Sequence, residues 1–334
     1  METIKQILTL FGGVSVFVYG LKQISENAER LIGGRIEKRL TAAVKNPFGG
    51  LAVGAVASAI AQSSIAVNMM TVGFAGGSVP FYGLTSVVVG ANIGTTVTAQ
   101  IISVSGLDGA AVWIFFAFLG LILSLFKGKG VRSTGGALIG LGLMFAGLVV
   151  MGDEINGLEK LAWFRGIFLS DDKFLLFLGG MALTGITQSS SGVTGVMILL
   201  AGKGLMEFGN AAFMILGSNV GSCFAVVVAS INKGDEKRAV AWFNLAFNLI
   251  GALIFMPFLF AFGDGIGDLF TGSTGDAGRA IANFHTVFNV LSAAAVMPFI
   301  KPLSSLTLRL VSGKKSAKKA VKGVSGVKRA VKIK

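Results

Sequence analysis

The chain has 334 residues, of which 53% are hydrophobic and only 13% are charged. A soluble domain carries about twice that share of charged residues, so the composition excludes an ordinary soluble protein and favours a polytopic membrane protein. The single cysteine, Cys223, excludes an internal disulfide and any cysteine-rich metal site.

The net charge of +13 would suit a nucleic-acid-binding protein, but the distribution of the charge argues against that partner. Eleven of the 29 Lys and Arg residues lie in 301–334, which contains no Asp or Glu, and most of the others lie in short gaps between apolar runs. Basic segments between apolar runs are typical of membrane proteins. The predicted partner is therefore the lipid bilayer and no nucleic acid, with 301–334 as a basic cytoplasmic tail that can touch anionic headgroups.

Seven apolar runs approach the length of about 20 residues that a helix needs to cross a bilayer. The predicted spans are 5–21, 82–104, 110–126, 134–151, 208–231, 239–262 and 280–300. The segment 22–45 mixes charged and apolar residues, which is compatible with an amphipathic helix at the membrane interface.

Two further apolar stretches, 47–77 and 174–202, are too long for one spanning helix and too short for two. Each carries polar residues at its centre, Gln62-Ser63-Ser64 in the first and Gln188-Ser189-Ser190-Ser191 in the second. We interpret both as re-entrant helical hairpins that fold back at the polar tip, which is tolerated only inside protein or along a watery cavity.

The polar landmarks recur at a near-constant offset, which indicates an internal duplication. Gln188-Ser189-Ser190 follows Gln62-Ser63-Ser64 by 126 residues, and Gly217-Ser-Asn219-Val-Gly221 follows Gly90-Ala-Asn92-Ile-Gly94 by 127. Repeat one is predicted at 1–126 and repeat two at 134–262, followed by an extra spanning helix at 280–300 and the tail.

Each repeat has three predicted crossings, an odd number, so the second repeat must enter from the opposite face. The expected fold is an all-α polytopic membrane protein of two inverted-topology repeats, each with a re-entrant hairpin and an interrupted transmembrane helix. If the basic loops 22–45, 127–133 and 232–238 lie inside with the tail, the N-terminus is outside and the C-terminus is cytoplasmic.

The tips have the chemistry of an anion site. The second arm of each hairpin begins just after the tip, so its free backbone amides and positive dipole end face the tip, with Ser64 and Ser190 as expected N-caps. The segments Asn92–Thr96 and Asn219–Cys223 are predicted to be unwound helix centres whose next half-helices begin at the same place. The predicted substrate-binding residues are Gln62, Ser63, Ser64, Thr95, Gln188, Ser189, Ser190, Ser191 and Ser222.

A cation has to accompany such an anion, because 46–126 has no charged residue except Asp108 and 174–202 has none. A multiply charged anion in mid-membrane without a fixed cation costs too much free energy unless cations travel with it. Sodium prefers the oxygen ligands present here, and no organic cofactor or other metal is expected. The predicted sodium ligands are Gln62, Asn92, Thr95, Thr96, Gln188, Ser191 and Asn219.

At these residues the chain resembles the bacterial branch of the type II sodium–phosphate cotransporter family. The family marks are Gln188-Ser189-Ser190-Ser191 and Gly90-Ala-Asn-Ile-Gly-Thr-Thr96, and the resemblance covers about 5–300. It implies sodium-coupled symport of inorganic phosphate by alternating access across the bacterial inner membrane. Departures are Ile65 in place of a third serine, Ser222-Cys223 in place of Thr-Thr, and Asn244 in place of histidine.

A further family pattern appears twice, as Arg279-Ala280 with His285-Thr-Val-Phe-Asn289 and as Arg238-Ala239 with Asn244-Leu-Ala-Phe-Asn248. We consider His285, Asn289, Asn244 and Asn248 as gating residues. The alternative for His285 is a neutral side chain bonded to a neighbouring helix. The sequence leaves open whether two copies form a homodimer.

Three other functions stay open at this point. They are symport of another small oxyanion or carboxylate, an anion channel, and a phosphate-sensing membrane protein without flux. An enzyme is not expected, because no catalytic constellation is present in the sequence.

Overall fold

The computed structural model describes residues 2–32, 44, 46–77, 79–104, 110–154 and 161–312. These residues form helices joined by turns, with no strand among them, so the all-helical prediction is confirmed. In chain order the elements are α1 (Glu2–Ile32), α3 (Pro47–Ala61), α4 (Ser64–Phe74), α5 (Phe81–Gly94), α6 (Thr96–Val104), α7 (Ala110–Ser124), α8 (Lys129–Glu154), α9 (Ala162–Phe168), α10 (Lys173–Thr187), α11 (Ser190–Gly202), α12 (Phe208–Ser230), α13 (Asp235–Thr274), α14 (Ala277–Val296) and the 3-10 helix η3 (Met297–Phe299).

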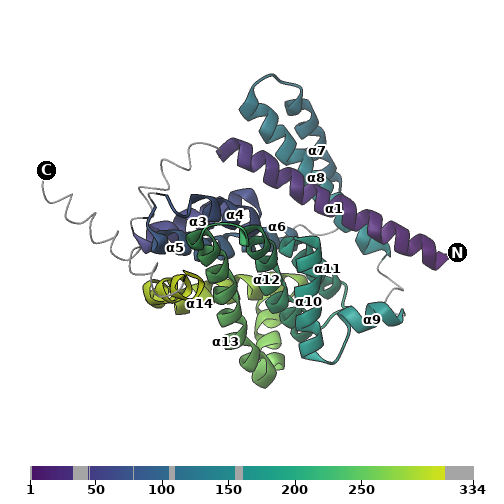
Figure 1. Ribbon diagram of the computed structural model, residues 1–334. Helices are drawn as coiled ribbons and strands as arrows, with labels where there is room; N and C mark the ends of the chain where they lie inside the picture. The colour runs from purple at the N-terminus through teal and green to yellow at the C-terminus, as the bar shows by residue number, and fades with distance from the viewer. Residues whose placement is uncertain are drawn as a thin grey trace, which may run out of the picture.

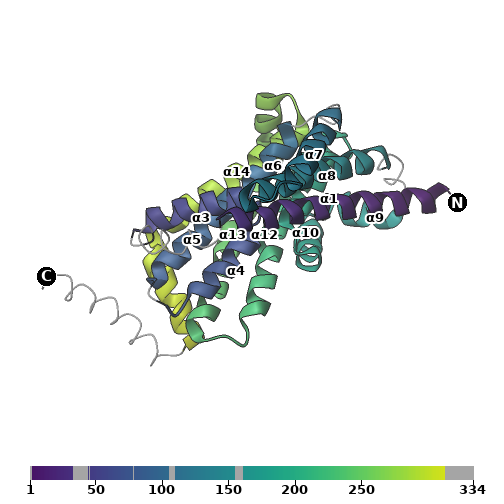
Figure 2. The same cartoon turned by 90° about the horizontal axis from the view of Figure 1, so that it is seen from above.

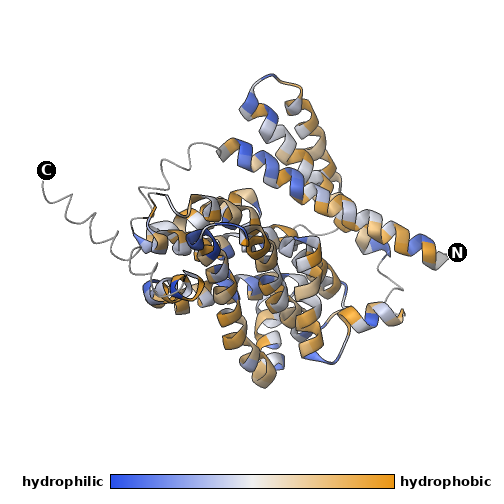
Figure 3. Ribbon diagram, in the orientation of Figure 1, coloured by the Kyte–Doolittle hydropathy of each residue, from blue (hydrophilic) through white to orange (hydrophobic). Residues whose placement is uncertain are grey.

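Six helical stretches of the described chain are long and apolar enough to cross a bilayer, which makes this a multi-pass membrane protein. They are Ile4–Leu31, Phe81–Val104, Lys129–Glu154, Phe208–Ser230, Asp235–Thr274 and Ala277–Ser312. The helix α13 is largely hydrophobic (Figure 3), and its Phe258 and Phe260 are exposed. Such faces suit contact with lipid chains.

The helices α1, α7 and α8 form a group on one side of the molecule (Figure 1), with α8 contacting both α1 and α7. Glycine lets the backbones of α1 and α8 approach closely. A Cβ atom on Gly20 would meet the carbonyl oxygen of Gly140, and one on Gly140 would lie 2.7 Å from that of Gly20. Gly13 and Gly147 form a second reciprocal contact, seven residues from the first on each helix, so α1 and α8 pack along their length.

The other helices form the body of the molecule, in which the first arm of each hairpin packs on a helix that follows it in the chain. The hairpin arm α3 packs on α5, and the hairpin arm α10 packs on α12 (Figure 2). Glycines permit both contacts at equivalent places. A Cβ on Gly90 would run into the backbone of Leu51 on α3, and a Cβ on Gly217 would run into the backbone of Phe177 on α10.

Four boundaries differ from the predictions. The residues 22–32 continue α1 and form no separate interfacial helix; 33–43 and 45 lie outside the described residues. The predicted span 110–126 forms α7, whose 15 residues are fewer than the roughly 20 a full crossing needs.

The other two differences lie near the C-terminus. The helix α13 runs on to Thr274, past the end of the predicted span 239–262, and that predicted end coincides with a kink at Phe262 (φ −135°, ψ 17°). The tail was predicted to begin at 301, but residues 300–312 are helical and continue the direction of α14 and η3 as one apolar stretch.

We predict that Gly20→Ala destabilises the protein although alanine is the better helix former. The new methyl group meets the backbone of α8, and overpacking of this kind costs about 1–3 kcal/mol. Gly12→Ala on the same helix is the matched control, because nothing lies within 4 Å of its Cβ position. Thermal unfolding of the detergent-solubilised protein measures both variants; an equal or higher midpoint for Gly20→Ala would contradict the close packing of α1 on α8.

Candidate functional site

The two polar tips have the same backbone geometry. The helix α3 ends at Gln62, whose φ of 54° and ψ of 25° are left-handed, and α10 ends at Gln188, with 53° and 29°. These are the two non-glycine residues with positive φ among the described residues. Because this region is unfavourable for a residue with a side chain, its use at both tips points to a functional constraint.

A serine begins the second arm of each hairpin. Ser63 is extended and its Oγ accepts a hydrogen bond from the amide of Ala66 at 3.2 Å; Ser189 does the same for Gly192 at 3.1 Å. The sequence prediction that Ser64 and Ser190 are the N-caps is therefore wrong by one residue. The left-handed glutamine turns the chain so that the next residue is extended and can cap, and Ser64 and Ser190 become the first helical residues.

Both tips line one cavity of about 250 Å³. From the hairpins it is lined by Gln62, Ser63, Ser64, Ile65, Thr187, Gln188, Ser189, Ser190 and Ser191. The first-turn amides of α4 and α11, which have no partner within their own helix, lie at this cavity, and so do the serine hydroxyls. The Oε1 atom of Gln62 is buried without a hydrogen-bond partner. Two helix N-termini with adjacent hydroxyls form an environment that favours an anion.

The third wall of the cavity comes from α1, which the sequence prediction had not placed there. Val18, Leu21, Lys22, Ser25 and Glu26 line it. The expectation of a site without lysine or arginine is wrong, because it treated Lys22 as part of a loop beyond the first span. The signal in the sequence was the spacing of Lys22 and Glu26, four residues apart, which suits a helical ion pair.

The remaining predicted residues lie elsewhere in the body. Asn92, Thr95, Thr96, Asn219 and Ser222 are all buried, but they are not among the residues that line the tip cavity. The structure thus brings together Gln62, Gln188 and the serines of the two hairpins, whereas four of the seven predicted sodium ligands do not line the cavity.

The first predicted helix interruption is a boundary between α5 and α6 without an unwound segment. Thr95 at this boundary keeps right-handed helical angles (φ −63°, ψ −22°) and donates its amide to the carbonyl oxygen of Ala91, and its buried Oγ1 has no hydrogen-bond partner. The helix α12 runs without interruption from Phe208 to Ser230, so the prediction of an unwound centre at 219–223 is wrong. There Ser222 donates its hydroxyl to the carbonyl oxygen of Asn219 at 2.7 Å, a bond that keeps the side chain on its own helix.

Two of the four candidate gating residues, Asn244 and Asn289, bond to the asparagines of α5 and α12. Asn92 donates to the side chain of Asn244 on α13 at 3.4 Å, and Asn219 donates to that of Asn289 on α14 at 3.5 Å. Asn248 donates to the side chain of Asn244 at 3.2 Å. These contacts form a buried polar layer that links α5 and α12 with α13 and α14.

His285 belongs to that layer by position, one helical turn before Asn289. It is 2% exposed and neither ring nitrogen has a hydrogen-bond partner. The alternative in which its ring bonds to a neighbouring helix is therefore not what this structure shows, and the role of His285 stays a prediction.

Comparison with known proteins identifies the relatives of this chain. A family model described as Na+/Pi-cotransporter matches residues 16–153 and 167–293, which include both tips and the cavity wall from α1. The protein YqeW of Bacillus subtilis (strain 168) is 27% identical over 249 residues, covering 73% of this chain and 80% of its own. No solved structure matches this chain.

Two further relatives carry functional names. A putative inorganic phosphate export protein, YjbB of Escherichia coli (strain K12), is 26% identical over 267 residues, which is 79% of this chain and 49% of the relative. The chain thus spans about half the length of that relative. The sodium-dependent phosphate transport protein 2B of Rattus norvegicus is 32% identical over 103 residues, which is 30% of this chain and 14% of the relative.

We predict that Gln188→Gly leaves the stability of the protein unchanged or raises it by up to about 1 kcal/mol, because glycine adopts a positive φ at little cost. Thr187→Gly, one residue earlier inside α10, is the matched control and should cost about 1 kcal/mol. Thermal unfolding in detergent measures both. Equal destabilisation by the two variants would show that Gln188 is not strained.

Proposed function

The chain belongs to the Na+/Pi-cotransporter family, and from this premise we propose that it is a secondary transporter that moves inorganic phosphate across the membrane together with sodium. The observation that carries the proposal is the meeting of the two Gln-Ser-Ser tips in one cavity. Amides at two helix N-termini and the hydroxyls of the five hairpin serines at the cavity suit the several acceptor oxygens of phosphate.

We infer that the two hairpins are re-entrant and belong to inverted repeats. The equal backbone angles of Gln62 and Gln188 and the equivalent packing of α3 on α5 and α10 on α12 support this inference. In such a fold the tips meet near the bilayer midplane and alternating access exposes them to each side in turn. The N-terminus is placed outside and the C-terminus in the cytoplasm of a bacterial inner membrane.

Sodium ligands are available in two places under this proposal. The carbonyl oxygens of Gln62 and Gln188 and the hydroxyl of Ser191 lie at the cavity. A second group lies in the buried polar layer, where the hydroxyl of Thr95 and the amide oxygen of Asn248 are buried without hydrogen-bond partners. Uncommitted oxygens inside a protein are the ligands that a small hard cation prefers.

Uptake by purified protein in proteoliposomes tests the coupling. Phosphate flux should require sodium and should be lost when potassium replaces it. Because relatives are named for phosphate export, flux is measured in both orientations of the sodium gradient. Flux that persists unchanged in potassium, or that follows a proton gradient instead, would overturn sodium coupling. The measurement with a proton gradient is necessary because Glu26 places a carboxylate at the cavity.

The same preparation separates the other candidates. Competition by arsenate but not by sulfate or succinate identifies a phosphate-like substrate. Current without concentrative uptake would identify an anion channel, and binding without flux would identify a sensor.

We predict that Ser190→Ala raises the apparent Kd for phosphate about tenfold. The buried hydroxyl lies at the cavity, and a hydrogen bond to a charged group contributes about 1.5–3 kcal/mol. Ser190 is preferred to Ser189 because Ser189 also caps α11, so its loss would disturb the fold. Ser124→Ala on α7, whose hydroxyl bonds to its own helix, is the control and should bind as the unaltered protein does. Unaltered phosphate binding by Ser190→Ala would show that the binding site lies elsewhere.

A further inference from the structure

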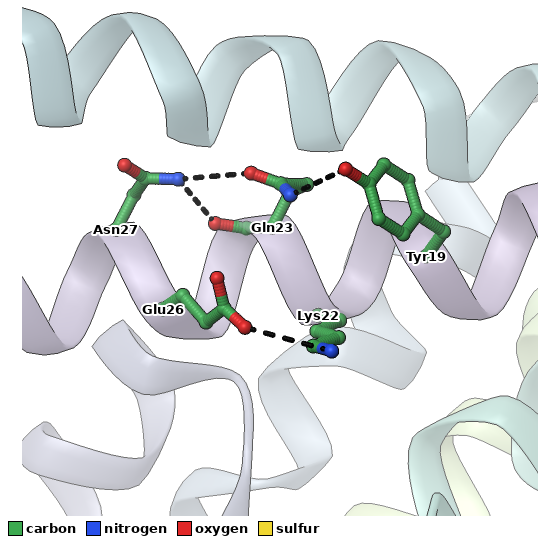
Figure 4. Close-up of polar contacts among 5 residues, drawn as sticks. All are labelled: Tyr19, Lys22, Gln23, Glu26 and Asn27. Atoms are coloured by element: carbon green, nitrogen blue, oxygen red, sulfur yellow. Dashed lines mark hydrogen bonds and ion pairs between the residues drawn. The ribbon is translucent and has the colours of Figure 1, made fainter.

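The charged wall of the cavity consists of Lys22 and Glu26 on α1. Their side chains form an ion pair with 3.8 Å between Nζ and Oε1, and they are 65% and 41% exposed. Figure 4 shows both on the face of α1 opposite to α8. Since both residues line the cavity that the tips form, this pair is not an ordinary surface contact.

The rotation of α1 about its own axis is fixed by its packing on α8, and the polar residues on that face bond to one another within α1 (Figure 4). Gln23 donates to the hydroxyl of Tyr19 at 2.9 Å, and Asn27 donates to the carbonyl oxygen of Gln23 at 2.8 Å. Asn27 is 5% exposed and packs against Gly136 of α8. This contact, together with the glycine pairs, holds Lys22 and Glu26 toward the tips.

The ion pair itself is weakly held. An exposed pair of this kind contributes little to stability, because water screens the charges and two long side chains must be ordered. An oxyanion bound at the tips would offer the ammonium group of Lys22 a second partner, in a place where two helix N-termini already favour negative charge.

We propose that Lys22 binds the transported anion directly and that Glu26 is the partner it releases when the anion arrives. The proposal rests on the proposed function for the identity of the anion. Lys22 is then a specificity-determining residue, supplying a point charge to an oxyanion that the hydroxyls and amides of the tips orient. Glu26 opposes binding, because its carboxylate competes for the same ammonium group.

Equilibrium binding of radiolabelled phosphate to the purified full chain in sodium tests this assignment. Lys22→Gln should raise the Kd about tenfold, as expected for losing one charge-assisted contact. Glu26→Gln should lower the Kd about threefold, and its effect should shrink when Lys22→Gln is also present, because the two residues act on each other. Lys22→Arg should retain part of the affinity.

The controls are Lys5→Gln and Glu29→Gln, which remove the same charges from exposed positions of the same helix that do not line the cavity. Both should bind as the unaltered protein does. Thermal unfolding without phosphate should be the same for all variants, since Lys22 is mostly exposed.

A Kd for Lys22→Gln in the range of the unaltered protein would overturn the proposal, and so would weaker binding by Glu26→Gln. Failure of the unaltered protein to bind phosphate would overturn the proposed function, and this inference with it. If the unaltered protein binds phosphate and Lys22→Gln binds it with the same Kd, this inference alone is overturned.

Discussion

The reversal of the chain at each hairpin tip is the constraint on which the rest of the site depends. A chain that ends one helix and begins the next within two residues must satisfy the last carbonyls of the first helix and the first amides of the second. Here a glutamine in the left-handed region ends one arm and a serine caps the next, at both Gln62-Ser63 and Gln188-Ser189. This order of residues directs the free amides of α4 and α11 into the cavity, and an ordinary glycine turn would provide no side chain there.

Close glycine contacts hold each reversal in place. Gly54 of α3 lies against the backbone of Val87, and Gly180 of α10, 126 residues later, lies against that of Met214. Without a hydrophobic driving force between helices in lipid, packing at such short range is what fixes one helix on another. The tips can therefore keep strained backbone angles, because the arms behind them are rigidly seated.

The sequence was sufficient to locate the tips and insufficient to complete the cavity. Polar residues at the centre of two apolar runs, duplicated at one offset, predicted the turns at Gln62 and Gln188 and their proximity. The wall from α1 was missed because hydropathy ends the first span near residue 21, where the charges begin. Those charges stay helical because they face a cavity and not lipid. The continuity of α12 was missed because Asn219 and Gly221 repeat the spacing of Asn92 and Gly94, which precede the boundary between α5 and α6. In α12, Ser222 bonds within its own helix.

Lys22 adds little net charge to the cavity, because Glu26 accompanies it. The Nζ atom of Lys22 and the Oε1 atom of Glu26 lie 3.8 Å apart and their formal charges cancel, so α1 contributes no net fixed charge there. A multiply charged anion that draws Lys22 away leaves Glu26 without its partner, and the sum of charges at the site becomes more negative. Uncompensated charge of that kind is costly away from bulk water. Mobile cations therefore remain the economical way to balance the anion, and under the two proposals above Lys22 positions the anion while sodium balances its charge.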